Sequence, residues 1–451
     1  MADTTLDIKN TDARTPESNS SAPVAVAKAD KHIWGIYICL LLISLIELYS
    51  ASSREVIAHS SFGVLGPVVR HAMMLGIGFV IVLTLQKIHY KWFIPATYIF
   101  VFVSVCMMIY VLLFGDIING ARRSFTLVFF QVQPAEFIKL SAVLLVSLIM
   151  AKSQIKKGVG VTNKGMWASA IAILIFSALL IKNGLTNTVL LMAISLSMML
   201  IGGVKFWRIL TVILIYAVCG LLFVMALSKN KDEENNLAAA TPIEQVATEQ
   251  TVKDETNRSG TWSARLERFF SDDETPKYQQ SITAENRQEM YAYMAQANGG
   301  VIGVFPGNSR ETARLPLAFS DFIYSIIIED LGFIGGLFIL VLYLWLLGRA
   351  SAVASRCSRA YPALLVIGMA VMIVFQAIVH MAIVTGAMPV SGQPLPLISK
   401  GGSSILVTSI AFGIMLSVSR FATKQSSKKR EIKLEIDALP EDMRGENPTQ
   451  L

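Results

Sequence analysis

Long apolar runs separated by short polar breaks fill most of the chain between residues 33 and 421. Ten of these runs are close to the ~20 residues that an α-helix needs to cross a bilayer. The pattern therefore predicts an all-α polytopic membrane protein with about ten transmembrane helices. The break at Lys182, Asn183 and Gly184 fits either a tight reversal or a broken helix. The runs cover residues 33–51, 68–86, 93–114, 134–151, 166–182, 185–202, 207–227, 322–347, 362–385 and 403–421.

The charged residues indicate how these helices are oriented. Four short breaks hold eleven Lys or Arg and no Asp or Glu: residues 86–92, 152–165, 202–208 and 348–361. With ten spans these breaks share one side, which the positive-inside rule identifies as the cytoplasm, and both termini lie there too. The predicted divisions are a cytoplasmic tail (1–32), helices 1–7 (33–227), a periplasmic loop (228–321), helices 8–10 (322–421) and a second cytoplasmic tail (422–451).

Composition excludes other classes of protein. Hydrophobic residues make up 53% of the chain and charged residues 16%, against about 25% charged residues in soluble domains. This excludes a water-soluble globule and a disordered or fibrous chain. Basic cytoplasmic loops explain the net charge of +7, so no nucleic-acid partner is expected. The four cysteines lie in apolar runs or a basic loop, and the histidines do not group with them, so neither disulfides nor a zinc cluster are expected.

The large outer loop between the seventh and eighth runs is acidic. From Ser228 to Ser320 it holds ten Lys or Arg and fourteen Asp or Glu, and its first part, 229–259, is polar. Further on, Trp262, Leu266, Phe269 and Phe270 have helical spacing. That spacing predicts an amphipathic helix on the membrane surface.

Asp321 is the first candidate for chemistry, because an ionisable group within a span costs at least ~2.5 kcal/mol on insertion scales. It opens the eighth run, at the boundary between the outer loop and the bilayer. A carboxylate there can act as a general base or simply stabilise the N-terminus of the helix. Glu329 and Asp330 lie two turns deeper, as a buried polar pair or as contacts to an outer cation.

A second group of candidates flanks the fourth run. Arg122 and Arg123 lie on the outer side, against the positive-inside trend, which favours binding of an anion such as a phosphate. Gln133 follows and is grouped with them as substrate-binding. Glu136 and Lys139 are spaced i,i+3 and can form a structural or a functional ion pair.

Polar residues on other runs are candidates for a supporting network. Glu47 lies near the outer end of the first run and Arg54 follows it. Each is either a snorkelling anchor or part of a polar lining. Gln376 and His380 are spaced i,i+4 on the ninth run, which favours a hydrogen bond between helices.

The string PVSGQPLPLISKGGSS joins the ninth and tenth runs on the outer side. Its three prolines and three glycines exclude a plain helix, and irregular backbone at that depth requires protein or a cavity around it. Lys400, with Ser403 and Ser404 after the glycine pair, predicts a cradle for a phosphate group.

Several strings, taken in order, resemble the SEDS family of shape, elongation, division and sporulation proteins. The resemblance runs from about Ile33 to Arg420. The GQPLPLISKGGSS string is more similar to the division member of the family than to the elongation member, and the sequence of the strings is similar to that of division members from Bacteroidetes. The strings are LYSASS (48–53), NGARR (119–123), QPAEFIK (133–139), GG (299–300), GNS (307–309), LP (315–316), SDFI (320–323), EDLG (329–332) and GQPLPLISKGGSS (392–404).

This resemblance implies a peptidoglycan glycosyltransferase that polymerises lipid II during septal wall synthesis. Asp321 matches the family's essential carboxylate and would take the proton of the acceptor 4-hydroxyl. The undecaprenyl pyrophosphate leaving group would be neutralised by Arg122 or Arg123, by Lys400, or by a divalent cation such as Mg²⁺ or Mn²⁺. The implied partners are a class B penicillin-binding transpeptidase and other division proteins, at the septum of the bacterial inner membrane.

Departures from the family pattern bear on the mechanism. Leu317 and Phe319 stand where the family often has Glu and His, and Ala313 and Arg314 stand near the usual place of a further acid. These changes put a mechanism with two carboxylates in doubt. A lipid II flippase, an elongation-type polymerase and a recruiting scaffold are the alternative readings.

Overall fold

A computed structural model describes most of the chain. The described residues are 28–55, 65–118, 121–127, 130–154, 160–181, 183–220, 269–270, 280–283, 286–315, 318–357 and 359–437. The acidic stretch 229–259 lies outside them, as does the predicted amphipathic helix apart from Phe269 and Phe270.

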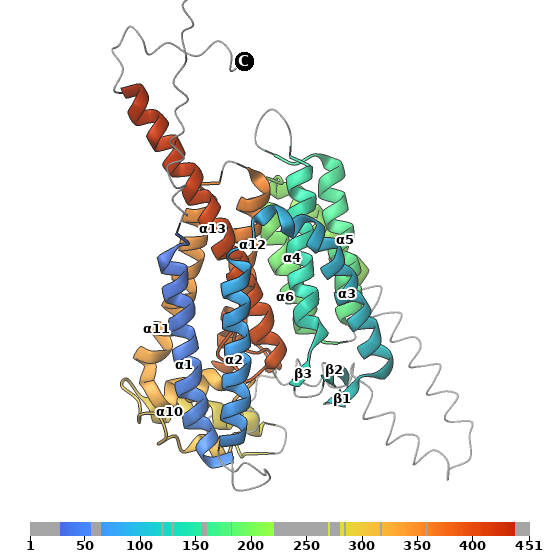
Figure 1. The fold of residues 1–451 in the computed structure, drawn as a ribbon. Helices are drawn as coiled ribbons and strands as arrows, with labels where there is room; N and C mark the ends of the chain where they lie inside the picture. Colours follow the sequence, from blue (N-terminus) through green and yellow to red (C-terminus); the bar gives the residue numbers. More distant parts are fainter. Residues whose placement is uncertain are drawn as a thin grey trace, which may run out of the picture.

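Each of the ten apolar runs contains a helix, because segments of this length and composition satisfy their backbone internally in lipid. Six of the described helices are long and apolar enough to cross a membrane, and three more are apolar but shorter (Val69–Leu85, Leu185–Ile201 and Phe206–Gly220). The protein is thus a polytopic helical membrane protein (Figure 1). Its helices are α1 (Lys31–Glu55), α2 (Leu65–Leu85), α3 (Phe93–Phe114), α4 (Pro134–Lys152), α5 (Asn163–Ile181), α6 (Leu185–Ile201), α10 (Arg287–Gly299), α11 (Ile323–Ala354), α12 (Ala360–Val384) and α13 (Gly402–Asp437), with short 3-10 turns η1 (Tyr90–Trp92) and η3 (Glu311–Ala313).

The break between α5 and α6 is a tight reversal. The backbone N–H groups of Asn183 and Gly184 both donate to the carbonyl of Leu180, at 2.8 and 3.0 Å. The two helices then pack against each other. Of the two readings left open by the sequence, the broken helix is therefore wrong.

A small antiparallel sheet corrects the purely helical prediction. Strands β1 (Asp116–Ile118), β2 (Ala121–Leu127) and β3 (Phe130–Val132) pair in the order β1-β2-β3. The pairing provides backbone hydrogen bonds for the connection between α3 and α4, outside the helices. The sheet and α10 lie at the end of the molecule opposite the C-terminal part of α13 (Figure 1).

Two helices extend furthest beyond their predicted spans. α11 runs to Ala354 instead of residue 347, and its backbone is broken at Gly332, where φ is 72° and ψ is −178°. The helical backbone of α13 continues to Asp437, well beyond the predicted end at residue 421, and projects from the bundle (Figure 1).

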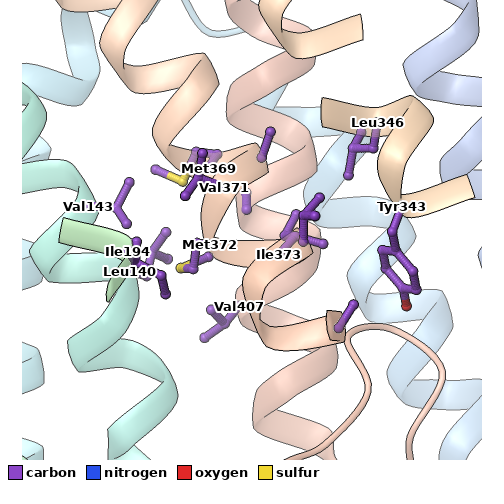
Figure 2. Close-up of a cluster of buried hydrophobic side chains, with 14 of the residues drawn as sticks. Leu140, Val143, Ile194, Tyr343, Leu346, Met369, Val371, Met372, Ile373 and Val407 are labelled. Carbon is purple, nitrogen blue, oxygen red and sulfur yellow. The ribbon is translucent and has the colours of Figure 1, made fainter. Parts of the chain in front are cut away.

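The core forms where α12 packs against α4, α6, α11 and α13. Leu140 and Val143 of α4, with Met369 and Met372 of α12, lie in one buried cluster (Figure 2). Tyr343 of α11 is fully buried at its edge, and its hydroxyl donates to the carbonyl of Pro396 at 2.6 Å. The connection between α12 and α13 is therefore anchored on the packed core, which gives it a defined position.

Candidate functional site

The segment before α11 and the connection before α13 lie side by side. The backbone N–H of Lys400 donates to the carbonyl of Phe319 at 2.8 Å, and the hydroxyl of Ser399 donates to the carbonyl of Ser320 at 2.7 Å. These bonds bring Lys400 close to Asp321 although 79 positions separate them in the sequence. The structure thus joins two of the residues that the sequence singled out.

Asp321 lies half-buried just before α11 begins. A Cβ placed on Gly392 would be only 2.7 Å from Asp321 Oδ2, so the carboxylate rests against the bare Cα of that glycine. The glycine therefore makes room for the carboxylate at the edge of the α12–α13 connection.

Lys400 supplies a cation at the same place. Its Nζ lies 5.4 Å from the centroid of the Phe319 ring, a cation–π distance. Phe319 is one of the departures from the family pattern, and here it positions the lysine. Two residues before Lys400, the carbonyl of Ile398 accepts from the Ser44 hydroxyl at 3.2 Å, and Ser44 also bonds to His71 Nε2 at 2.8 Å. Helices α1 and α2 therefore support the connection that carries Lys400.

Ser403 and Gln133 connect the starts of two helices. The backbone N–H of Gln133, at the N-terminus of α4, donates to the hydroxyl of Ser403 in the first turn of α13 at 3.2 Å. Ser404 is also buried, and its hydroxyl has no hydrogen-bond partner among the described residues. The predicted cradle thus lies where α4, α13 and the α12–α13 connection meet.

A buried polar triad fixes α4 to α12. Lys139 Nζ lies 2.7 Å from Glu136 Oε1 and donates to Gln376 Oε1 at 3.1 Å. The side-chain amide of Gln376 also donates to Glu136 Oε2 and to the carbonyl of Pro394, both at 3.3 Å. Gln376 thus makes the interhelical hydrogen bond expected of it and extends the triad to the α12–α13 connection.

His380 lies one turn further along α12 and is fully buried. Its Nδ1 lies 2.6 Å from the carbonyl of Gln393. Because a carbonyl only accepts, Nδ1 carries a proton and donates it to this carbonyl. Gln393, the residue after Gly392, is therefore anchored to α12 through His380.

The two arginines of NGARRSF lie on β2. Arg122 is exposed, and its guanidinium donates to the carbonyl of Leu113 near the end of α3. Arg123 is half-buried on the same strand. β2 packs against α3 and α4, and β3 packs against α13. The arginines thus occupy the same outer end of the bundle as the start of α13.

Sequence reasoning missed the donors that hold Glu329. This buried carboxylate accepts from the Ser309 hydroxyl, from the backbone N–H of Arg310 at 2.9 Å and from the side-chain amide of Asn298 at 3.4 Å. Glu311 is buried beside it and pairs with Arg314 at 3.5 Å. The GNS string and the acid shortly after it are the signal that could have indicated this network.

α10 packs against α11 and was not predicted as a helix. Gln296 donates to the carbonyl of Val384 at 2.9 Å and to the Ser325 hydroxyl at 3.2 Å, which ties α10 to α12 and α11. Burial, together with the charge of Glu289, raises the pKa of the Tyr293 hydroxyl. The Gly299–Gly300 pair in the sequence marks the end of this helix, where Gly299 packs directly on the backbone of α11.

Metal binding was left open by the sequence. Within the described ranges, no group of three or more His, Cys, Asp or Glu side chains is arranged to hold a metal ion. The side chain of Arg54, which was expected in the supporting network, lies outside the described part of the structure.

Comparison with known proteins gives consistent matches over nearly the whole chain. The family described as cell cycle protein, which comprises FtsW, RodA and SpoVE, matches residues 30–424. A protein of Trichlorobacter lovleyi named probable peptidoglycan glycosyltransferase FtsW is 28% identical over 88% of this chain and 94% of its own length. Stage V sporulation protein E of Bacillus subtilis is also 28% identical, over 86% of this chain and 96% of its own.

Solved structures share the fold. The crystal structure of rod shape determining protein RodA from Thermus thermophilus matches with a TM-score of 0.56 and 22% identity, covering 87% of this chain and 97% of that one. A chain from a structure on the coordination of polymerization and crosslinking by a peptidoglycan synthase complex has a TM-score of 0.60 and 23% identity, with coverages of 87% and 98%.

Proposed function

Because the chain belongs to the FtsW, RodA and SpoVE family of cell cycle proteins, we propose that it is a peptidoglycan glycosyltransferase that polymerises lipid II. Two observations support the proposal. Relatives named as probable peptidoglycan glycosyltransferases align over most of its length. The observation on this chain that carries it is the approach of Asp321 to the connection bearing Gly392 and Lys400, at the outer end of the bundle.

The reaction assigns a distinct role to each side chain. Asp321 accepts the proton of the acceptor 4-hydroxyl as that oxygen forms a bond to the anomeric carbon of the donor. The bond between this carbon and the pyrophosphate oxygen breaks through an oxocarbenium-like transition state. The negative charge that develops on undecaprenyl pyrophosphate is stabilised by Lys400 and by Arg122 or Arg123.

The hydroxyls of Ser403 and Ser404 and the end of α4 at Gln133 contribute to the pyrophosphate site in this proposal. Their support is their position, since Gln133 and Ser403 are bonded to each other and Ser404 keeps an unpartnered hydroxyl among the described residues. The triad of Glu136, Lys139 and Gln376 fixes the positions of α4 and of the α12–α13 connection that carry these residues.

The setting of the reaction is part of the proposal. We place the protein at the septum of the bacterial inner membrane, with both termini cytoplasmic, together with a class B penicillin-binding transpeptidase and other division proteins. The basic short loops support the orientation. The division-type relatives support the septal role, and the match to a chain of a peptidoglycan synthase complex supports a partner enzyme.

Polymerisation by the purified protein tests the proposal directly. The full chain, reconstituted with its transpeptidase partner, is incubated with lipid II, and glycan strands are resolved on a gel. Wild type should form polymer, and Asp321→Asn should reduce it by at least about a hundredfold, within the range for loss of a general base. Glu289→Gln, a carboxylate change on α10, should retain activity.

The other readings predict different results in this assay. Lipid scrambling in liposomes without polymer under any partner condition would mean a flippase. Normal complementation of a deletion strain by Asp321→Asn would mean a scaffold. Either result contradicts the proposed function.

A further inference from the structure

Two carboxylates, one on α1 and one on α11, are buried with no ion pair to a cation among the described residues. Glu47 and Asp330 both have 0% exposed surface. Both side-chain oxygens of Glu47, and Oδ1 of Asp330, lack a hydrogen-bond partner among the described residues. Ser50 lies one helical turn after Glu47 on α1, and its hydroxyl donates to Asp330 Oδ2, so both carboxylates lie at the same contact between α1 and α11. A buried, unpartnered charge of this kind is costly, so the pair must either take up a proton or bind a cation.

The surroundings make the place more negative. Glu329 adjoins Asp330, and its charge acts on that neighbour. The helical backbone of α11 is interrupted immediately afterwards at Gly332. At this interruption the carbonyls of Glu329 and Asp330 accept the backbone N–H groups of Val304 and Phe305, both at 2.9 Å, which fixes this segment against the acidic pair. If Glu47 and Asp330 shared one proton, the three carboxylates Glu47, Glu329 and Asp330 would still carry two negative charges.

Ser50 adds a further oxygen and connects the pair to the outer loop. Its hydroxyl donates to Asp330 Oδ2 and accepts the backbone N–H of Gly307 at 2.7 Å. Ser44, Glu47 and Ser50 are spaced by three residues and are all buried, so they form one polar stripe along α1.

We propose that Glu47 and Asp330 bind a divalent cation that joins the outer ends of α1 and α11. The chemical class is a hard cation with oxygen ligands, such as Mg²⁺ or Mn²⁺, which proteins commonly bind through one or two carboxylates. Two carboxylates neutralise one divalent charge. Water fills the remaining positions, as is usual for Mg²⁺. The cation fastens α1 to α11 and, through Ser50, to the loop at Gly307, and it lies apart from Asp321.

Binding of Mn²⁺ to the purified full chain tests this site without any need for lipid II. Electron paramagnetic resonance measures free and bound Mn²⁺ for wild type, Glu47→Gln, Asp330→Asn and Asp321→Asn. Wild type should bind one tight Mn²⁺ per chain. Each of the first two variants should weaken binding at least tenfold, and Asp321→Asn should bind as wild type does. Mn²⁺ should also raise the melting temperature of wild type but not of Glu47→Gln.

Glu47→Asp keeps the charge and should retain part of the Mn²⁺ binding, which controls for misfolding of the amide variants. Absence of tight Mn²⁺ in wild type would overturn the site and mean that the pair shares a proton. If Asp321→Asn lost Mn²⁺ binding while Glu47→Gln kept it, the metal would bind near Asp321 instead, and the proposed site at Glu47 and Asp330 would be wrong. A polymerisation failure of wild type would contradict the proposed function but would leave the Mn²⁺ result unaffected.

Discussion

The carboxylate of Asp321 rests against Gly392, with Oδ2 only 2.7 Å from the place where a Cβ on that glycine would be. A methyl group there cannot coexist with the observed carboxylate position. Gly392→Ala should therefore displace Asp321 and lower the polymerisation rate at least about tenfold, because small misplacements of a catalytic group are costly. The measurement is the initial rate with saturating lipid II.

Gly76→Ala on α2 is the matched control, since nothing lies within 4 Å of its added Cβ. It should polymerise at the wild-type rate. If Gly392→Ala also kept the full rate, the carboxylate would not need this position for catalysis.

The triad between α4 and α12 should behave as a buried ion pair. Glu136→Gln or Lys139→Met alone leaves one charge uncompensated among buried groups, which typically costs about 3–5 kcal/mol. Each single variant should lower the melting temperature in detergent. The double variant should recover part of the loss, because no lone charge remains. Equal or larger loss in the double variant would show that the pair is not coupled in this way.

The break in α11 should depend on glycine. At Gly332 φ is 72°, and an added Cβ would lie 2.2 Å from the carbonyl oxygen of Val301. Gly332→Ala should destabilise the protein by more than about 1 kcal/mol, since this backbone conformation disfavours other residues. Gly348→Ala in the same helix meets nothing within 4 Å and should be neutral or stabilising. Thermal melting of the two variants compares them directly, and equal melting temperatures would contradict the argument.

The ion pair at the opposite end should give a pH dependence of stability. Burial raises the pKa of Asp30, but the hydrogen bond and charge of Arg349, together with hydrogen bonds from the backbone N–H groups of Ile33 and His32, outweigh it and leave that pKa below its usual value of 3.8. The stabilisation is therefore complete above the unfolded-state pKa and is lost as the pH falls through the lower folded-state value. Melting temperatures of wild type and Asp30→Asn should differ at pH 6 and converge toward pH 3. A difference that is independent of pH would contradict the assignment.

The sequence predicts the helical framework well, and the reasons are physical. A bilayer demands runs of nearly fixed length, so each apolar run contains a helix. A glycine inside such a run is compatible with helix, so the break at Gly332 gives no signal in the pattern. Strands of three residues, such as β1 and β3, are too short to show an alternating pattern.

Only part of the candidate site could be predicted from the sequence, because its hydrogen bonds join residues that are distant in the chain. Asp321 and Lys400 stand out because charged residues near apolar runs are rare. The bonds that bring them near each other, from Lys400 N–H to Phe319 and from Ser399 to Ser320, join segments far apart in the chain. One sequence does not reveal which distant polar groups meet, and the resemblance to the family names residues rather than their hydrogen bonds.

The unbroken course of α13 has a mechanical consequence. Its 36 residues make a rod of about 54 Å at 1.5 Å per residue. One tip carries Ser403, bonded to the beginning of α4, and the other stands clear of the bundle (Figure 1). A force applied to the distal tip would be transmitted to the hydrogen bond between Ser403 and Gln133 as tilt or rotation, since the helical rod has no break within its span.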